Sequence, residues 1–170
     1  QEARLLQFKL PAAQAFARAN GIDRVALQAQ RLRLGIVTAG KAYLDVRQAL
    51  EELGLDDAAA ARLGIGIYKV GMSWPLEPQG IGAFGRGAEQ VLVVEEKRSL
   101  IEAQIKELLF NAADAPRCVV GKRDEQGMPL VPEHGELSAA LIAQIIAARL
   151  GGLAGEATVQ ARLDRLQRIG

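Results

Sequence analysis

The stretch LGIVTAGKAYLDVRQAL, residues 34–50, decides the fold class of this 170-residue chain. Its first part is a short apolar run, which is typical of a buried strand. In the part that follows, apolar residues recur at spacings of three and four, which predicts a helix over residues 41–53 that ends at Gly54. A buried strand followed at once by an amphipathic helix is the unit from which parallel α/β sheets are built.

Similar units recur along the rest of the chain. Apolar runs predict strands over residues 34–38, 65–70, 90–95 and 118–120. Helical spacing predicts helices over residues 100–111 and 138–150, the second capped by Ser138, and a short glycine-rich helix over residues 80–84. In the helix over residues 100–111, Glu102 and Lys106 are expected to form an i,i+4 pair on the face opposite the apolar residues. The connections are long enough for crossovers, so we expect a mostly parallel sheet with helices on both faces, which is an open α/β/α sandwich.

Composition excludes several classes of protein. Hydrophobic residues make up 49% and charged residues 24%, as in an ordinary folded chain, and the net charge of +1 argues against a nucleic-acid or anionic-membrane surface. No apolar run is long enough to span a bilayer, and the N-terminus lacks a signal-peptide pattern. A single cysteine, Cys118, forms no internal disulfide and by itself holds neither zinc nor an iron–sulfur cluster. We expect a cytoplasmic protein and a Cys118 thiol buried at the start of its strand.

The chain divides into three parts. Residues 1–31, with a helix expected over residues 12–19, are predicted to be a linker arm, and residues 1–35 carry a net charge of +4. Residues 32–150 form the α/β domain. Residues 151–170 are predicted to be a terminal helix or a linker to a next domain. Because the chain begins at Gln1 without a Met, we expect it to have been cut from a longer protein.

The turn after the first predicted strand is a candidate anion site. Residues 35–42 match the phosphate-binding pattern G-x-x-x-x-G-K but end in Ala, where a triphosphate site needs Ser or Thr to reach magnesium. Thr38, Gly40 and Lys41 still lie at the carboxyl end of a strand and at a helix N-terminus, where backbone N–H groups attract anions. The competing interpretation, which we favour, is a tight turn that needs a small residue.

A charged run follows the third predicted strand, and it consists of Glu95, Glu96, Lys97 and Arg98. Such a run is usually the solvated start of a helix, but in open α/β sheets ligands bind at this strand end. We weigh an interface role, in which Glu95 and Glu96 accept hydrogen bonds from a partner, evenly against the solvated start, and we disfavour direct catalysis. After the second predicted strand, Lys69 and Trp74 border a loop that covers the sheet edge or a partner. All three loops follow parallel strands, so they should meet at one edge.

Four motifs in the same order give the chain a family resemblance. They are residues 34–50, YKVGMSWPLEP at residues 68–78, VLVVEEKR at residues 91–98, and VGK at residues 120–122 with GELS at residues 135–138. The segment from about residue 32 to 150 resembles the middle portion of the long, fused form of indolepyruvate:ferredoxin oxidoreductase. The resemblance implies a fold similar to the transketolase C-terminal domain, with a five-stranded, mainly parallel sheet and one antiparallel strand.

The resemblance also implies a function for the whole enzyme. Members of that family oxidatively decarboxylate arylpyruvates, pass electrons to ferredoxin and the acyl group to coenzyme A, and use thiamine diphosphate, magnesium and iron–sulfur clusters. None of the usual binding motifs for these cofactors is visible here. We therefore expect an accessory domain that binds no cofactor itself, contacts the thiamine-binding domains, and belongs to an enzyme that is a homodimer at full length. An independent small-anion or ligand-binding α/β module is the alternative, and a freestanding enzyme is disfavoured.

Overall fold

A computed structural model describes residues 1–151 and 164 of the chain, and in this part five strands form one sheet in the order β1-β3-β2-β4-β5. The strands are β1 Arg24–Leu27, β2 Leu32–Ala39, β3 Ile65–Val70, β4 Ala88–Val94 and β5 Val119–Val120. The strands from β2 to β5 run parallel, and β1 pairs antiparallel with β3. The mainly parallel five-stranded sheet predicted from the sequence is therefore confirmed.

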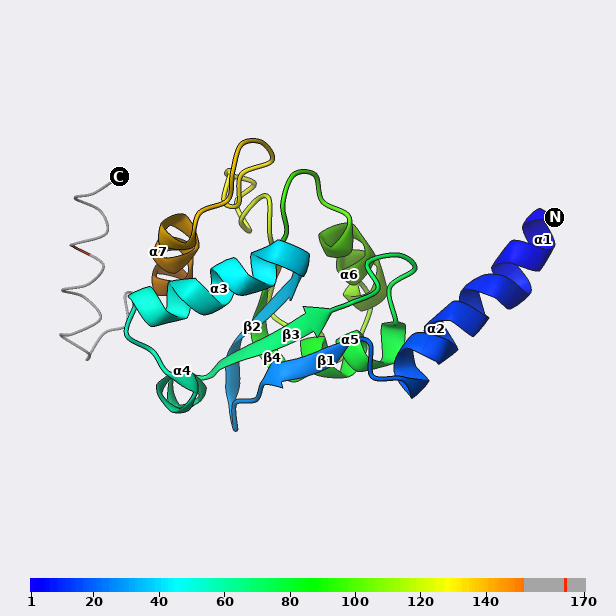
Figure 1. The fold of residues 1–170 in the computed structure, drawn as a ribbon, viewed down its shortest axis with the longest axis horizontal. Coiled ribbons are helices and arrows are strands. Elements are labelled where there is room, and N and C mark those ends of the chain that lie inside the picture. The colour runs from blue at the N-terminus through cyan, green and yellow to red at the C-terminus, as the bar shows by residue number, and fades with distance from the viewer. Residues whose placement is uncertain (152–163, 165–170) are drawn as a thin grey trace.

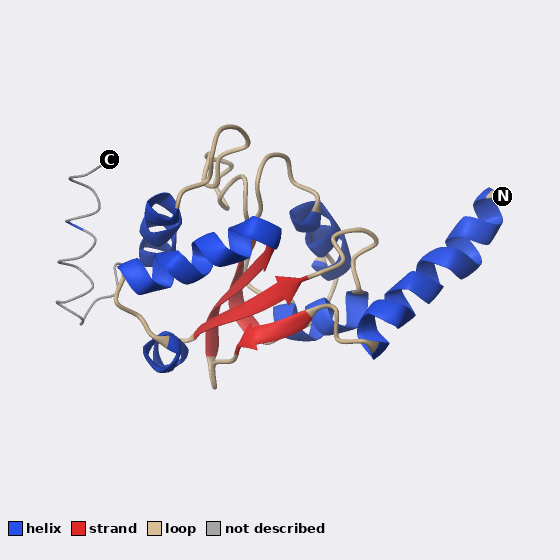
Figure 2. Ribbon diagram, in the orientation of Figure 1, coloured by secondary structure: helices blue, strands red, loops and turns tan. Residues whose placement is uncertain are grey.

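Helices cover both faces of this sheet, so the domain has three layers (Figures 1 and 2). On one face lie α3 Gly40–Glu52, α4 Asp57–Leu63 and α7 Ala139–Arg149, and on the other lie α5 Pro78–Arg86 and α6 Ile101–Leu109. Alternate residues of β2 feed the two cores: Ile36 packs toward α3 and α7, whereas Val37 packs toward α5 and α6. None of the helices in the described part of the chain is long and apolar enough to cross a membrane.

A glycine in the central strand sets how closely α5 approaches the sheet. A Cβ atom added at Gly35 would lie 2.9 Å from a ring carbon of Phe84, which is closer than carbon atoms normally approach. The missing side chain lets the Phe84 ring lie on the strand, where it also meets the Tyr68 ring with 5.3 Å between centroids. Gly35 is thus required for packing.

Several elements differ from those predicted. The sheet begins at β1, inside the segment assigned to the linker arm, because a four-residue edge strand leaves little periodicity in the sequence. Helix α4 was not predicted, and α5 is nine residues long instead of one or two turns. Cys118 precedes β5 and is half-buried, so the prediction of a buried thiol is wrong. The predicted C-terminal helix lies outside the described residues, apart from position 164.

A helical arm precedes the sheet and projects from the body of the domain (Figure 1). It consists of α1 Glu2–Arg4, a π-helical segment η1 Leu5–Lys9, and α2 Leu10–Ala19, which contains the helix predicted over residues 12–19. The end of α2 is fixed to the body, since Arg18 lies 2.6 Å from the Glu77 carboxylate and the Gln14 amide donates to the Leu76 carbonyl at 2.9 Å. The rest of the arm extends beyond these contacts.

Candidate functional site

The candidate site lies at the carboxyl edge of the parallel strands, where the chain connections diverge. From β2 the chain crosses to β3 on one side, while β4 leads to β5 on the other. In open α/β sheets, ligands and partners bind at such a switch point. Thr38 pairs in register with Lys69 in β3 and with Val94 in β4, so the three candidate loops begin at the same level of the sheet.

The corner between β2 and α3 holds the first group of predicted residues. Gly40 has φ of +54°, a left-handed conformation that favours glycine, and it lets the chain turn directly from strand to helix. The Thr38 side chain is buried, and its hydroxyl has no hydrogen-bond partner among the residues that the structure describes. The residue before α3 is Ala39, whose side chain makes no capping hydrogen bond to the helix N-terminus.

Lys41 joins this corner to the loop after β4. Its ammonium nitrogen lies 2.9 Å from the Asp45 carboxylate, 3.8 Å from that of Glu96 and 3.9 Å from that of Glu136. The hydrogen bond with Asp45, helped by the charges of Glu96 and Glu136, raises the pKa of Lys41. These groups are largely exposed, apart from Asp45. The expected approach of residues 38–41 to residues 95–98 is therefore present, and their charges remain available to a partner.

Glu95, the neighbour of Glu96, is used differently. Its buried carboxylate accepts hydrogen bonds from the backbone N–H groups of Leu100, Ile101 and Glu102, at 3.1, 2.9 and 3.1 Å. These donors belong to the first turn of α6, where backbone N–H groups lack partners and a negative charge is favoured. We expected Glu95 to accept hydrogen bonds from a partner, but its acceptors serve the domain's own helix.

A buried lysine completes this corner. Lys122, in the turn after β5, donates from its ammonium to the backbone carbonyls of Glu95 and Pro132, and its backbone N–H donates to the Glu102 carboxylate at 2.9 Å. Burial lowers the pKa of Lys122, against the attraction of the neighbouring carboxylates. The predicted pair between Glu102 and Lys106 is present at 2.6 Å, although Glu102 is buried instead of lying on an exposed face.

Sequence reasoning missed this buried cluster of Glu95, Glu102 and Lys122. The i,i+4 spacing of Glu102 and Lys106 indicated a surface pair, and that interpretation hid the burial of Glu102. The signal that could have found the cluster is the position of Lys122 directly after a strand, level with the carboxyl ends of the others. A charge at that place is either exposed at the edge or buried beneath the neighbouring loop.

The remaining predicted residues border the same edge. The Lys69 ammonium lies 4.6 Å from the centre of the Tyr43 ring of α3, which is a cation–π contact. Trp74 is 57% exposed, in a loop held by Gln104, whose side chain bonds to the backbone of Ser73 and Leu76. Lys97 adopts φ of +57° in the exposed turn before α6.

A hollow of about 340 Å³ opens beside α6 at this edge. It is lined by Ser99 and by both buried and exposed charged residues, namely Arg98, Glu102, Lys106, Lys122, Arg123 and Glu133. Arg98 lies in this hollow, away from the Lys41 corner. In the described residues, no three His, Cys, Asp or Glu side chains come together as metal ligands would. The arrangement supplies charged groups and an exposed indole, which suit polar recognition of a partner.

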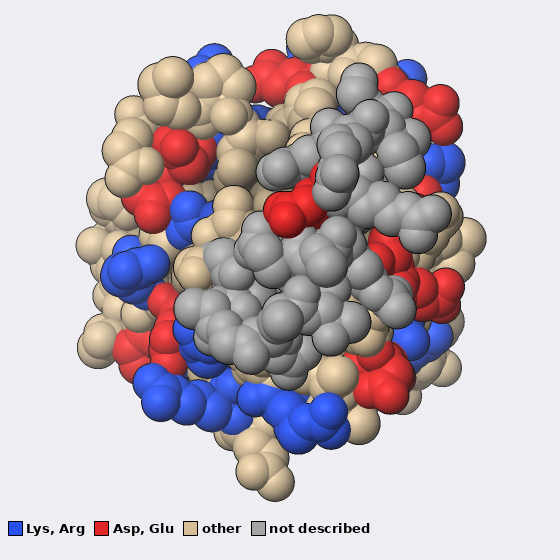
Figure 3. All heavy atoms as spheres, turned by 90° about the vertical axis from the view of Figure 1, so that its left-hand side faces the viewer, with Lys and Arg blue, Asp and Glu red and all other residues tan. Residues whose placement is uncertain are grey.

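The opposite, amino edge of the sheet is basic, and two of its arginines, Arg31 and Arg149, pair with carboxylates. Figure 3 shows Lys and Arg side chains gathered along the lower margin of one face. Arg31, Arg33 and Arg62 line one hollow there, and Arg33, Arg117 and Arg149 line the next. The Arg31 guanidinium lies 2.6 Å from the Glu89 carboxylate.

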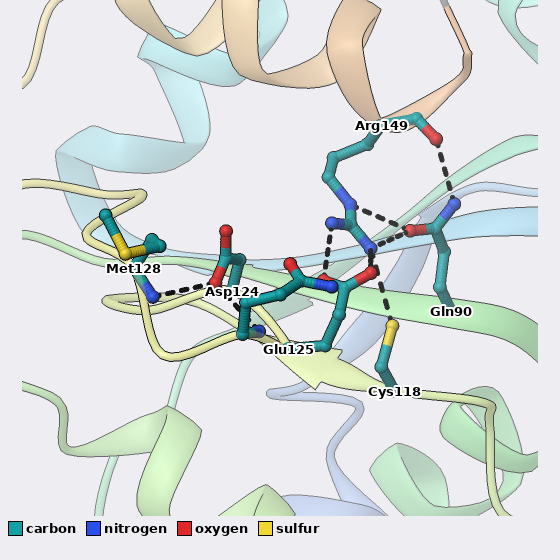
Figure 4. A network of polar contacts seen from close by, with 7 residues as sticks. Gln90, Cys118, Asp124, Glu125, Met128 and Arg149 are labelled. Atoms are coloured by element: carbon teal, nitrogen blue, oxygen red, sulfur yellow. Dashed lines mark hydrogen bonds and ion pairs between the residues drawn. The ribbon is translucent and has the colours of Figure 1, made fainter.

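Arg149 at the end of α7 ties three elements together at this amino edge (Figure 4). Its guanidinium donates to the Gln90 side chain of β4 at 2.7 and 2.9 Å and to the Glu125 carboxylate at 2.7 and 3.2 Å. It also donates to the Cys118 sulfur at 3.4 Å. The hydrogen bond from Arg149 lowers the pKa of Glu125. Arg149 thus bonds to Gln90, Glu125 and Cys118 of this domain, and we assign it a structural role.

Comparison with known proteins gives consistent matches. A family model described as "Indolepyruvate oxidoreductase domain" matches residues 24–169. The chain is 31% identical over 120 residues to indolepyruvate oxidoreductase subunit IorA of Thermococcus kodakarensis, and 29% identical over 119 residues to that of Pyrococcus abyssi. Each alignment covers 70% of this chain but 16% of the relative, so the chain spans about a sixth of the length of these relatives.

Two solved structures share the fold. One is a 2-oxoglutarate:ferredoxin oxidoreductase from Magnetococcus marinus with 2-oxoglutarate, coenzyme A and succinyl-CoA bound, which has a TM-score of 0.50 and 18% identity over 84% of this chain and 23% of the other. The second is a split-gene transketolase in an inactive β4 tetramer, also with a TM-score of 0.50 and 18% identity, over 76% and 41%. At this level of identity the likeness concerns the fold alone.

Proposed function

Because this chain belongs to the indolepyruvate oxidoreductase domain family, we propose that it is an accessory and interface domain of a larger 2-oxoacid:ferredoxin oxidoreductase. The whole enzyme would oxidatively decarboxylate indolepyruvate and related arylpyruvates. In that reaction carbon dioxide leaves, the acyl group passes to coenzyme A and the electrons pass to ferredoxin. We place the enzyme in the cytoplasm and expect a homodimer at full length.

The cofactors of such an enzyme do not fit the described residues or the cysteine content of the sequence. Thiamine diphosphate needs a magnesium site, and the described residues contain no suitable group of ligands. An iron–sulfur cluster needs several thiolates, and the sequence has one cysteine. We therefore assign thiamine diphosphate, magnesium and the clusters to other parts of the enzyme, and we derive no chemical step within this domain.

The charged corner at Lys41 carries the proposal of an interface. The Lys41 ammonium lies within 4 Å of both the Glu96 and the Glu136 carboxylate, all three groups are exposed, and they stand at the switch point of the sheet. Trp74 adds an exposed indole at the same edge, and Trp is enriched where partners meet. We propose that this edge, including Thr38, Gly40, Lys69, Lys97 and Arg98, contacts the thiamine-binding domains.

The second candidate function is an independent module that binds a small anion at residues 38–41. The unpartnered hydroxyl of Thr38 and the uncapped N-terminus of α3 favour it. Against it stand three carboxylates around the one exposed cation of that turn, from Asp45, Glu96 and Glu136. An anion at Lys41 would be repelled by these groups, so we rank this function second.

The experiment has two parts, and the first uses the 170-residue chain alone. Incubated with thiamine diphosphate, magnesium, indole-3-pyruvate, coenzyme A and an electron acceptor, it should form no acyl-CoA above a control without protein. Product formation would contradict the assignment of the cofactors to other parts of the enzyme.

The second part uses the full-length enzyme with Glu96→Ala or Trp74→Ala. Loss of one partner from a desolvated charged contact costs about 2–5 kcal/mol, so assembly and turnover should fall while the isolated domain keeps its stability. Arg62→Ala, at the amino edge, is the matched control and should leave assembly and turnover unchanged. If all three variants behave like the wild type, this edge is merely solvated and the interface proposal is wrong.

A further inference from the structure

The helical arm presents two different faces. The face toward the body carries Ala17, which is fully buried, and Gln14, which is half-buried and bonded to the loop before α5. The outward face carries Leu5, Phe8 and Phe16, which are 40%, 66% and 61% exposed. Leu6 is 57% exposed as well, so the projecting part of the arm has large apolar side chains on more than one side.

The local geometry of the arm follows from Pro11. Proline has no N–H to donate to the carbonyl four residues earlier, and its ring disfavours the ordinary helical turn before it. The preceding segment widens accordingly into the π-helix η1, in which Leu10 N–H donates to the Leu5 carbonyl, five residues back. The helix continues through this wide turn. Leu5, Phe8 and Phe16 are therefore held on one continuous element.

Exposed side chains of this size on a projecting helix indicate a binding surface. Single exposed apolar residues are common, but clustered ones mark sites of interaction. With about 150–250 Å² for a fully buried aromatic side chain, the outward face and Leu6 offer on the order of 400 Å². A stable dimer needs about 800 Å² per partner, so this face is too small to hold a second copy by itself.

The charges beside the apolar residues define the rim of the complementary surface. Arg4 and Lys9 flank Leu5 and Phe8 on the arm, and neither has an ion-pair partner within residues 1–151. Glu2 is the one acidic residue of the projecting part. A surface that accepts this arm should therefore be an apolar groove bordered by carboxylates. Helices commonly bind such grooves through residues spaced by three, four and seven or eight positions.

We propose that Leu5, Phe8 and Phe16 dock into an apolar groove with an acidic rim on a part of the same polypeptide outside these 170 residues. This inference rests on the proposed function, which makes the chain one domain of a longer enzyme. The relatives are about six times longer than the matched segment. A longer enzyme of this kind would carry the groove on the same polypeptide as the arm. Tethering gives a high effective concentration, and a small apolar face then suffices.

Photo-crosslinking in the full-length enzyme tests the occupant directly. The photoreactive residue benzoylphenylalanine replaces Phe8 in one variant and Phe16 in another, and mass spectrometry identifies the crosslinked peptides. We expect both positions to crosslink, within one chain, to a peptide outside these 170 residues that contains apolar residues and Asp or Glu. Ala58, on the exposed side of α4, carries the same group in the control and should give at least tenfold less of that product.

The other outcomes overturn the proposal. Crosslinks between two copies of the arm would make the occupant a second copy, and crosslinks no stronger than those from Ala58 would leave the face solvated. A second variant, Phe8→Ser with Phe16→Ser, should increase the rate of proteolytic cleavage within residues 1–19 at least several-fold in the full-length enzyme. The proposed function is tested separately by the Glu96 and Trp74 variants, so failure of one proposal does not imply failure of the other.

Discussion

Two corners at the carboxyl edge of the sheet use the same kinds of side chain in opposite ways. At the β4–α6 corner, Glu95, Glu102 and Lys122 are buried and bonded to the domain's own backbone. At the β2–α3 corner, Lys41 and Glu96 remain exposed and lie 3.8 Å apart. The adjacent residues Glu95 and Glu96 therefore differ in role: Glu95 holds the start of α6, whereas Glu96 lies at the exposed edge.

The difference teaches which charges a partner can use. The oxygens of a buried carboxylate that caps a helix already accept hydrogen bonds from backbone N–H groups, so its removal lowers the stability of the fold. An exposed ion pair contributes little to folding, with a median of about 0–1 kcal/mol, and keeps its charges for a partner. Stability and assembly should therefore respond to different substitutions, and the predictions below separate them.

The largest effect is expected at Glu95. In the 170-residue chain, Glu95→Ala should lower the free energy of unfolding by about 2–3 kcal/mol, because three N–H groups at the start of α6 lose a buried acceptor. Urea unfolding followed by circular dichroism measures this change. Glu96→Ala is the matched control and should stay within about 0.5 kcal/mol of the wild type. Equal losses at both positions would remove the distinction between the corners.

A half-buried charge at the amino edge, Arg149, extends the comparison. Arg149→Met should lower the free energy of unfolding by about 1–2 kcal/mol, since Gln90 and Glu125 lose their shared donor. Arg149→Lys should restore less than half of the loss, because an ammonium cannot donate to several partners in a plane. Arg117→Met, at an exposed arginine of the same hollow, should be nearly neutral. A neutral Arg149→Met would show that a half-buried charge with several hydrogen bonds does not by itself mark structural importance.

Acid unfolding tests a second helix-capping glutamate, Glu77. Burial raises its pKa, but the hydrogen bonds from Gly80, Gln79 and Arg18 outweigh burial and lower the pKa below the ordinary 4.5. A carboxyl with a lowered folded-state pKa stabilises the fold above its unfolded-state pKa, and the contribution is lost as pH falls through the folded-state value. Wild type should therefore lose about 1 kcal/mol more than Glu77→Gln on acidification below pH 4.5.

Arg18→Met serves as the control for that measurement. It removes one of the groups that lower the pKa of Glu77 but leaves the two backbone donors, so its acid profile should lie between those of wild type and Glu77→Gln. Identical profiles for all three proteins would contradict a capping role for Glu77 and the attachment of the arm through Arg18.

How far the sequence predicts this molecule depends on the periodicity of each element. The apolar run in residues 34–38 and the three-and-four spacing in α3 are strong signals because both elements face the core along most of their length. β1 has four residues and one buried side chain, so its sequence shows no periodic pattern that would predict a strand. Pairing with β3 decides its structure. The glycines of α5 weakened the prediction of that helix, although Gly82 and Gly85 are buried in its packing against α6.

The sequence predicts which edge of the sheet carries the candidate site, but it does not predict which side chains are buried there. Parallel strands place Thr38, Lys69 and Val94 in register, so their loops had to meet. Whether Glu95 or Glu96 turns inward depends on which carboxylate reaches the N-terminus of α6, a contact made five to seven residues along the chain. A local pattern of four charges does not contain that information.

The smallest effect on the free energy of unfolding is expected for the pair of Lys41 and Glu96. A double-mutant cycle with Lys41→Ala and Glu96→Ala, measured on the 170-residue chain, should give a coupling free energy below about 0.5 kcal/mol, because both groups are solvated and 3.8 Å apart. Salt should reduce it further.

In the full-length enzyme the same cycle, read from the free energy of assembly, should give a larger coupling. A partner that covers the edge removes water from the pair, and close charge pairs in desolvated interfaces couple by about 1.5 kcal/mol or more. Lys41 and Asp45 provide the internal reference, since they are neighbours on one helix turn and their coupling should change less on assembly. Equal coupling of Lys41 and Glu96 in the fragment and in the enzyme would mean that the β2–α3 corner faces solvent in both, and the contrast between the two corners would then concern folding alone.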